Sequence, residues 1–241
     1  FGAHYCTANI FSELTPDYLS AFTYYFDVIL KPFSRFMIRA IEKIKPLEIN
    51  VICPGHGPVH RDTKAEIIAL TEKLSDEYLK LTAGGEVKRV LVAWVSAYGF
   101  TGKAAEYIAE GIRSESGFVT DVTDIENIAP AELDRKLAAA DAILVGSPTI
   151  NQNTLLPVYT LFALINPLRD RGKIAGAFGS YGWSGEAPRI ILDNLRNLKL
   201  KTIDETAGFK FAPEGEKKES LVGFGRKFAI EVEAASSREE K

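Results

Sequence analysis

The chain has 241 residues, 46% of them hydrophobic and 25% charged, enough apolar material for one large domain or two small ones. A formal net charge of −3 argues against nucleic acid as a partner, and no apolar run is long enough to span a membrane. Two cysteines, Cys6 and Cys53, make no disulfide framework and no signal peptide opens the chain, so we expect a cytoplasmic protein. Because the first residue is Phe1 and no methionine precedes Met37, we also expect a piece of a longer protein.

Residues 1–82 have the pattern of an incomplete domain. A helical stretch over Pro16–Lys45 is followed by a strand over Glu48–Cys53, a tight Pro54–Pro58 turn and a charged helix over Lys64–Leu81. One strand and two helices cannot close a sheet core by themselves. We therefore expect the carboxyl-terminal part of a larger domain.

Residues 83–87 indicate a linker, and residues 88–235 alternate short apolar strands with helices. The strands are predicted at Arg89–Val95, Phe118–Asp124, Ala142–Gly146, Lys173–Phe178 and Thr206–Phe211. The helices are predicted at Gly102–Ser116, Pro130–Ala140, Leu155–Asn166, Ala187–Leu198 and Ser220–Ala234. This alternation predicts an α/β fold, a flavodoxin-like, doubly wound sheet of five parallel strands. Residues 236–241 are expected to form a solvated tail.

The first of these strands ends in a turn rich in hydroxyls and glycine, which then becomes a helix. Such a turn places free backbone N–H groups and the positive end of a helix dipole around one space, which suits a phosphate. Ala97 and Ala104 stand where a Walker loop needs glycine and Ser or Thr, and the dinucleotide pattern G-x-G-x-x-G is absent. A phosphate monoester remains, with Ser96, Tyr98, Gly99 and Thr101 as candidate contacts. The alternative is an ordinary turn with Thr101 as the helix N-cap.

The third and fourth strands end in loops of the same kind, Gly146–Asn151 and Gly179–Gly185. Pro148 fixes the chain, the glycines permit close approach, and Asn151 offers an amide. Stacking on an aromatic ring system explains Trp183 between glycines, although packing on its neighbours explains it too. Plain crossover turns are the alternative for both loops. Together the three loops predict a phosphate site beside a flat slot at one edge of the sheet, which is the shape of FMN.

The three loop sequences resemble the FMN loops of flavodiiron proteins, also called A-type flavoproteins. The resemblance implies that FMN contacts Ser96, Ala97, Tyr98, Gly99, Phe100, Thr101, Ser147, Pro148, Thr149, Ile150, Asn151, Ser180, Tyr181, Gly182, Trp183, Ser184 and Gly185. Phe100 departs from the family, which commonly has asparagine at this position. Its backbone amide is retained.

The resemblance continues upstream of the linker. Ile52–Val59 looks like the closing histidine segment of the family's metallo-β-lactamase-like domain, and Tyr24–Phe33 resembles its late helix. The resemblance therefore implies that residues 1–82 are the end of such an αββα domain. Phe1-Gly2 looks like the dipeptide that closely follows the family's bridging aspartate, which places the start of the chain just after that ligand.

Most ligands of the family's diiron site have no counterpart. The family uses a His-x-Glu-x-Asp-His cluster, a further histidine, a bridging aspartate and the histidine of a Pro-x-His-Gly turn, and His56 matches only the last. His56 is then either the surviving ligand of a longer protein or a structural turn histidine, and His4 is interpreted as structural. One imidazole does not hold two irons, so a diiron centre is expected only if the missing amino-terminal part is present.

The resemblance implies a flavodiiron-type oxidoreductase. FMN accepts electrons from a small redox protein of the rubredoxin or ferredoxin type, and a diiron centre then reduces nitric oxide or dioxygen, in a head-to-tail homodimer. Two alternatives stay open for this chain: a stand-alone flavodoxin-like electron carrier without metal, and a non-catalytic scaffold. No catalytic acid or base is assigned, because electron transfer through FMN needs none from the protein.

Overall fold

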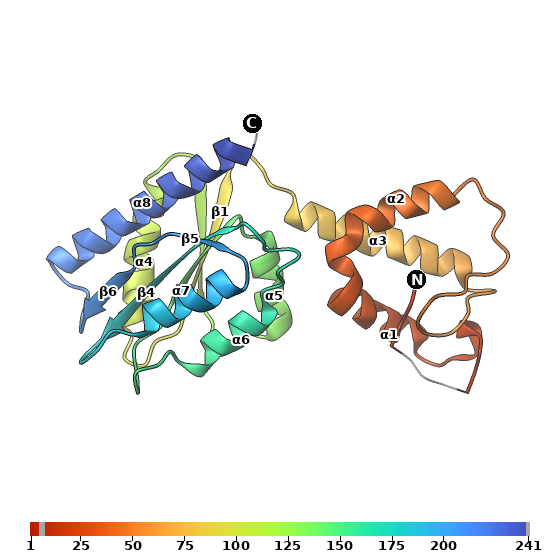
Figure 1. Cartoon of the computed structure of the whole chain (residues 1–241), viewed down its shortest axis with the longest axis horizontal. Helices are drawn as coiled ribbons and strands as arrows, with labels where there is room; N and C mark the ends of the chain where they lie inside the picture. Colours follow the sequence, from red (N-terminus) through yellow and green to blue (C-terminus); the bar gives the residue numbers. More distant parts are fainter. Residues whose placement is uncertain (5–7, 240–241) are drawn as a thin grey trace. The chain divides into compact units, whose positions relative to one another are not determined.

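The computed structural model describes residues 1–4 and 8–239, and the chain divides into two compact units, Phe1–Ala83 and Gly84–Lys241 (Figure 1). Each unit has its own hydrophobic core. Cys53 is an exposed free thiol, whereas Cys6 lies outside the described residues. In the part of the chain that the structure describes, no helix has the length and apolar composition needed to cross a bilayer.

The second unit is built on a parallel sheet. Its strands are β1 (Lys88–Trp94), β2 (Phe118–Asp124), β3 (Ala142–Gly146), β4 (Ile174–Tyr181), β5 (Lys201–Thr202) and β6 (Ala207–Lys210), in the order β2-β1-β3-β4-β5, with β6 also on β4. β5 pairs with the start of β4 and β6 with its end, so two short strands share the fifth position. The predicted five-stranded doubly wound fold is confirmed with this change. β5 escaped prediction because two residues carry no periodic pattern.

Helices cover both faces of this sheet (Figure 1). α4 (Phe100–Arg113) and α8 (Glu216–Glu239) share one core cluster with the strands, and α5 (Pro130–Ala139), α6 (Leu156–Leu164) and α7 (Ala187–Asn197) share the other. The central strands β1, β3 and β4 are therefore largely buried on both sides, which explains their mainly apolar sequences. Residues 236–239, expected in a solvated tail, continue α8, and residues 240–241 lie outside the described part of the chain.

Two glycines allow α4 and α8 to pack backbone to backbone. A Cβ on Gly111 of α4 would lie 2.0 Å from the carbonyl oxygen of Val222, and a Cβ on Gly225 of α8 would lie 2.1 Å from that of Ile108. No larger residue fits at either position without moving a helix. This contact fixes the position of α4, whose first turn borders the loop that follows β1.

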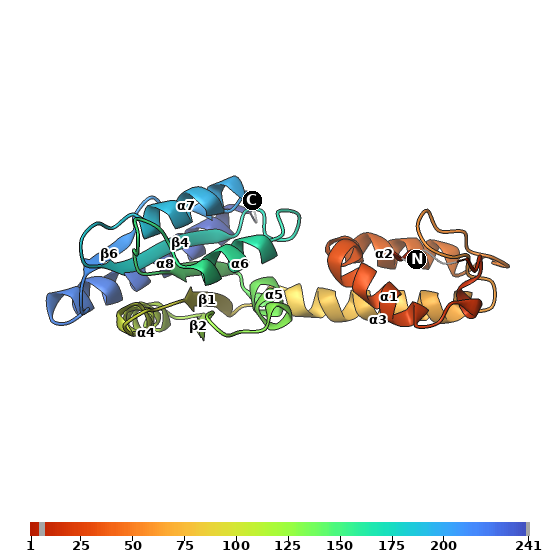
Figure 2. The ribbon, with the colours of Figure 1, turned by 90° about the horizontal axis from the view of Figure 1, so that it is seen from below.

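The first unit is mainly helical, and α2 and α3 lie side by side in it (Figures 1 and 2). Its elements are η1 (Ser12–Leu14), α1 (Tyr18–Tyr25), the π-helical turn η2 (Phe26–Leu30), the 3₁₀ turn η3 (Lys31–Phe33), α2 (Ser34–Ile44) and α3 (Lys64–Thr82). The helical stretch predicted over Pro16–Lys45 is thus present from Tyr18 to Ile44, but it is not one regular α-helix. It changes to π and 3₁₀ turns around Pro32, because proline has no N–H to donate and its ring clashes with a preceding carbonyl.

The strand predicted at Glu48–Cys53 is wrong. Within the described residues this segment forms only an isolated antiparallel bridge, in which Ile52 and His60 exchange two backbone hydrogen bonds of 2.9 Å. The core of this unit is a small cluster formed by Ala3, Tyr18, Phe22, Tyr25 and Ile67. A lone bridge beside a helical core leaves most of the segment without a ladder partner, which is why its β-like composition does not produce a strand.

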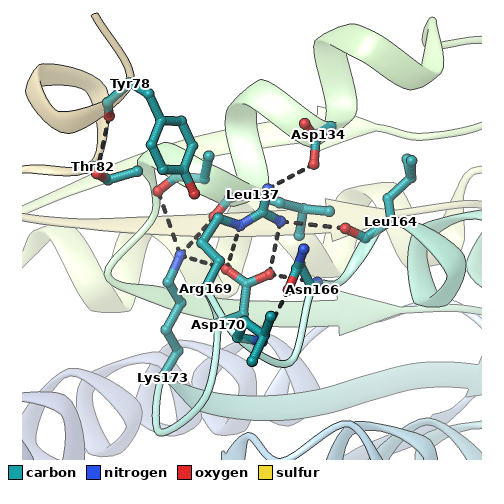
Figure 3. A network of polar contacts seen from close by, with 11 residues as sticks. Tyr78, Thr82, Asp134, Leu137, Leu164, Asn166, Arg169, Asp170 and Lys173 are labelled. Atoms are coloured by element: carbon teal, nitrogen blue, oxygen red, sulfur yellow. Dashed lines mark hydrogen bonds and ion pairs between the residues drawn. The ribbon is translucent and has the colours of Figure 1, made fainter. Parts of the chain in front are cut away.

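A buried ion network lies just before β4, at the amino end of the sheet (Figure 3). The guanidinium of Arg169 donates to both carboxylate oxygens of Asp170, at 2.8 and 2.7 Å, and to Asp134 at 2.7 Å. The ammonium of Lys173 lies 2.9 Å from Asp170 and donates to the carbonyl oxygen of Leu137. Asp170 is fully buried, and burial lowers the pKa of Lys173. The network pairs these buried charges with one another at the amino edge of the sheet, which is the edge opposite the predicted site.

Candidate functional site

Three loops meet at the carboxyl edge of the sheet, because β1, β3 and β4 run parallel. They are the first loop (Ser96–Thr101), the second loop (Ser147–Asn151) and the third loop (Ser180–Gly185). The hydroxyl oxygens of Thr101 and Ser180 are 2.9 Å apart, which joins the first loop to the third. The N–H of Thr149 donates to the carbonyl of Ser180 at 2.9 Å, which joins the second loop to the third. The structure therefore brings the three predicted loops together.

A cavity of about 130 Å³ opens between the loops. Its lining consists of Tyr98, Phe100, Pro148, Thr149, Ile150, Ser180, Tyr181, Gly182 and Phe211. All except Phe211 were predicted as site residues from the sequence. Of the other predicted residues, Ser96, Ala97, Gly99, Thr101, Ser147, Asn151, Trp183, Ser184 and Gly185 belong to the same loops but not to this lining.

The helix that follows the first loop begins earlier than predicted. Gly99 is the N-cap of α4, with a left-handed φ of 80° and no side-chain cap hydrogen bond. Thr101, considered above as the N-cap, instead lies inside the first turn, fully buried, and its N–H donates to the Ser96 hydroxyl at 3.2 Å. A Cβ built on Gly99 would meet nothing within 4 Å. Open space therefore lies beside Gly99 at the amino terminus of α4, which is where a phosphate site would lie.

The second loop is closed by its own hydrogen bonds. The buried hydroxyl of Ser147 accepts the N–H of Leu155 at 3.1 Å, and Ile150 and Asn153 exchange two backbone bonds. Asn151 and Gln152 both have left-handed φ values, 53° and 57°, as in a type I′ turn. Asparagine tolerates this conformation better than most residues, so the turn accounts for Asn151 without a ligand.

The aromatic side chains of the loops are exposed to very different degrees. Trp183 is 97% exposed and Tyr98 81% exposed, so neither packs against the loop that carries it. Tyr181 ends β4 and is half-buried in the cavity lining. The alternative that Trp183 packs on its neighbours is therefore wrong. Its indole is free to meet a ligand or another protein.

Sequence reasoning missed Phe211, which lies directly after β6. Its N–H donates to the carbonyl of Tyr181 at 2.9 Å, which places it beside the third loop. The signal available in the sequence was an aromatic residue at the end of the last strand. The sequence analysis assigned Phe211 only to the end of the predicted strand Thr206–Phe211.

The residues present fit FMN. The first turn of α4 supplies amides, the neighbouring hydroxyl of Ser96 supplies a polar contact, and Tyr98 and Tyr181 supply flat apolar surface beside them. A phosphate end and a planar aromatic end are the two features that distinguish FMN from a simple anion. No cationic side chain lines the cavity, so amides and hydroxyls would carry the phosphate.

The histidines of the first unit lie in two places. The ring of His56 lies 5.9 Å from that of His4 and 6.3 Å from that of Tyr25, and His4 makes an edge contact with Tyr25 at 4.7 Å. His60 is fully buried and forms hydrogen bonds with Phe1, Ser12 and Tyr18. Burial lowers the pKa of His60. Among residues 1–4 and 8–239, no group of three or more His, Cys, Asp or Glu side chains is placed to hold a metal.

The model of the flavodoxin family matches residues 92–224, more than half of the chain. The chain belongs to the flavodoxin family. The match begins in β1 and ends in α8, so it covers the three loops and the cavity between them. FMN is the cofactor that a flavodoxin-like domain binds.

The similarity to flavodiiron proteins extends over nearly the whole chain. A type A flavoprotein of Rhodobacter capsulatus is 34% identical over 95% of this chain and 52% of its own length. A flavo-diiron protein of Clostridium acetobutylicum is 32% identical over 96% of this chain and 58% of its own. The structure of rubredoxin oxygen:oxidoreductase from Desulfovibrio gigas matches 97% of this chain and 58% of its own with a TM-score of 0.65 and 25% identity. The resemblance predicted from the loops is confirmed, and the chain spans about half the length of the curated relatives it matches.

Proposed function

We propose that this chain binds FMN between its three loops and transfers electrons through it, as part of a flavodiiron-type oxidoreductase. The observation that carries the proposal is the convergence of three loops, predicted separately, on one cavity beside the first turn of α4. The flavodoxin match over residues 92–224 and the similarity to a flavo-diiron protein support it.

In this proposal the protein positions the cofactor and shapes its surroundings. The amides of the first turn of α4 and the hydroxyl of Ser96 hold the phosphate, while Thr101 and Ser180 brace the first loop against the third. Tyr98, Tyr181 and Trp183 surround the ring system. Bound FMN supplies the electron-accepting and electron-donating chemistry. The remaining predicted loop residues contribute backbone contacts; they are Ala97, Gly99, Phe100, Ser147, Pro148, Thr149, Ile150, Asn151, Gly182, Ser184 and Gly185.

The wider reaction rests on the relatives. We propose that residues 1–82 are the end of a metallo-β-lactamase-like domain, that His56 is a metal ligand there, and that other ligands come from protein beyond this chain. The electron donor would be a rubredoxin or ferredoxin-type protein, and the acceptor nitric oxide or dioxygen. One structural relative is named for rubredoxin and oxygen. A head-to-tail homodimer would bring the flavin of one subunit near the metal site of the other, in the cytoplasm.

The stand-alone electron carrier is the second candidate. It is favoured by the absence of a metal-ligating cluster from the described residues. It shares the FMN site with the first candidate and differs from it in iron content alone. A scaffold without cofactor is the third candidate, and the fitted cavity argues against it.

A visible absorption spectrum of the purified chain, before and after adding FMN and removing the excess, tests the proposal. We expect flavin bands equivalent to about one FMN per chain, because there is one three-loop site. A protein that stays colourless after FMN is added would refute flavin binding. Because the first candidate takes its other metal ligands from protein beyond this chain, the natural protein separates the two redox candidates: an intact mass above 26.5 kDa with stoichiometric iron supports the first, and flavin without iron supports the second.

A further inference from the structure

One residue of the cavity lining has an unfavourable backbone conformation. Phe211 has a φ of 58°, in the left-handed region that bulky residues rarely occupy. Such strain persists only where the surrounding structure holds it in place, and it concentrates at ligand sites. Phe211 is also 57% exposed, a large apolar ring facing solvent beside the cavity.

Four contacts of the flanking segment hold Phe211 in this conformation. Its own N–H donates to Tyr181 at 2.9 Å. The ammonium of Lys217 donates to the carbonyl oxygens on both sides, Lys210 at 2.6 Å and Ala212 at 3.2 Å. Glu214 forms an ion pair with Lys103 of α4. The turn is therefore tied to β4, to α8 and to the helix that begins at the first loop.

The position of the ring also explains a glycine of the third loop. A Cβ on Gly182 would lie 3.1 Å from Cε1 of Phe211, tighter than an ordinary contact. The ring thus lies against the backbone of Gly182, next to Tyr181. Phe211 and Tyr181 together present flat apolar surface at the side of the cavity formed by β4 and β6.

We propose that Phe211 is a further flavin-contacting residue, whose ring forms a wall of the cavity and contacts the planar part of FMN. This inference rests on the proposed function, because it takes FMN as the ligand. A bound ring system would cover the exposed face of Phe211. The strained backbone would already hold the phenyl ring in its binding position before FMN arrives, so binding would not have to order it. The position of Lys217, which holds the turn without lining the cavity, makes it a positioning residue for Phe211.

The experiment distinguishes the effect of losing the aromatic ring of Phe211 from the effect of relieving its backbone strain. Phe211→Gly and Phe211→Asn both remove the ring and place there a residue that tolerates a left-handed φ. We expect FMN affinity, measured by quenching of flavin fluorescence, to fall about 5- to 100-fold, as for other lost stacking contacts. The unfolding temperature without FMN should stay the same or rise by a few degrees. Phe211→Tyr should bind FMN like the wild type.

Lys199 offers a matched control. It is an exposed residue of the same unit with a φ of 70°, directly after Leu198, the C-cap of α7, and outside the cavity lining. Lys199→Gly should also keep or raise the unfolding temperature, but it should leave FMN affinity unchanged. Using two ring-removing variants keeps the test valid if one of them folds poorly.

A double-mutant cycle tests the role given to Lys217. Lys217→Gln should weaken FMN binding in the wild-type background and have little further effect in Phe211→Gly, since it acts through the ring. Additive losses would contradict this role. If the wild type binds FMN and Phe211→Gly binds it equally well, the inference is overturned while the proposed function stands. If the wild type binds no FMN, both are overturned.

Discussion

The two units of the chain differ in how completely each covers its own apolar surface. In the second unit, strands β1, β3 and β4 are buried between two helix layers, and the most exposed aromatic residues, Trp183 and Tyr98, lie on the loops of the candidate site. In the first unit, a small core coexists with exposed apolar side chains spread along the helical segment from α1 to α2, such as Tyr24 (66%) and Phe36 (62%).

This difference separates two origins of apolar exposure. In the second unit, the most exposed aromatic side chains lie where a ligand is proposed, and two large clusters of buried residues form the core on either side of the sheet. In the first unit, exposure follows from a core too small to bury the apolar side chains available. We therefore expect the second unit to be the more stable of the two, with its own unfolding transition.

The largest effect is expected from the buried ion network. Asp170→Asn leaves Arg169 and Lys173 without their shared carboxylate and should lower the free energy of unfolding of the second unit by about 3–5 kcal/mol. Both tryptophans, Trp94 and Trp183, lie in this unit, so tryptophan fluorescence during denaturation reports on it alone.

An exposed ion pair of the same unit provides the control. Asp193 and Arg196 are about half exposed and lie 3.2 Å apart. Asp193→Asn should cost less than about 1 kcal/mol, because solvent screens the pair. Equal losses from the two substitutions would show that the network before β4 contributes no more than a surface contact.

A smaller loss is expected where α4 and α8 touch. Gly111→Ala introduces a Cβ 2.0 Å from the Val222 carbonyl and should destabilise the second unit by about 1–3 kcal/mol, since the helices must separate. Gly223→Ala, in α8 with nothing within 4 Å of its Cβ, should instead stabilise it by about 0.5–1 kcal/mol. Chemical denaturation followed by tryptophan fluorescence measures both, and a loss at Gly223 like that at Gly111 would contradict the packing argument.

Sequence reasoning succeeded where local pattern and tertiary context agree. The apolar strands and their helices are matched closely because burial on both faces leaves a continuous hydrophobic signal, as in Ala142–Gly146. It failed at Glu48–Cys53, whose composition suits a strand but whose ladder partner is missing from the described residues. It predicted the helical stretch over Pro16–Lys45 but not the change to π and 3₁₀ turns around Pro32.

The same reasoning placed the three loops but not every contact. Ser96, Pro148 and Tyr181 could be found because each lies at or just after the carboxyl end of a parallel strand, and these ends must lie at the same edge. Phe211 could not, since its place beside Tyr181 depends on the register of β6 against β4. The hydroxyl contact between Thr101 and Ser180 likewise depends on where α4 begins, two residues earlier than the sequence predicted.

Exposed aromatic residues of the two units should behave differently toward FMN. Trp183→Ala should weaken FMN binding by about 1–3 kcal/mol if the indole stacks on the ring, without lowering the unfolding temperature, because its side chain is 97% exposed. Phe36→Ala, at 62% exposure in the first unit, should leave FMN affinity unchanged. A flavin titration of both variants measures this, and unchanged affinity in Trp183→Ala would remove Trp183 from the site.

The smallest effect is expected from acid, and it should appear in the first unit. Burial holds the pKa of His60 below its unfolded value of about 6.5, so the folded state binds this proton less readily than the unfolded chain. The contribution of neutral His60 to the free energy of unfolding is therefore complete above about pH 6.5, and it is lost as the pH falls toward the folded-state pKa of His60. Hydrogen exchange of the α1 and α3 amides should accelerate between pH 7 and pH 5, after correction for intrinsic rates. His60→Gln should flatten this dependence, and an equally steep profile in that variant would assign the acid sensitivity to another group.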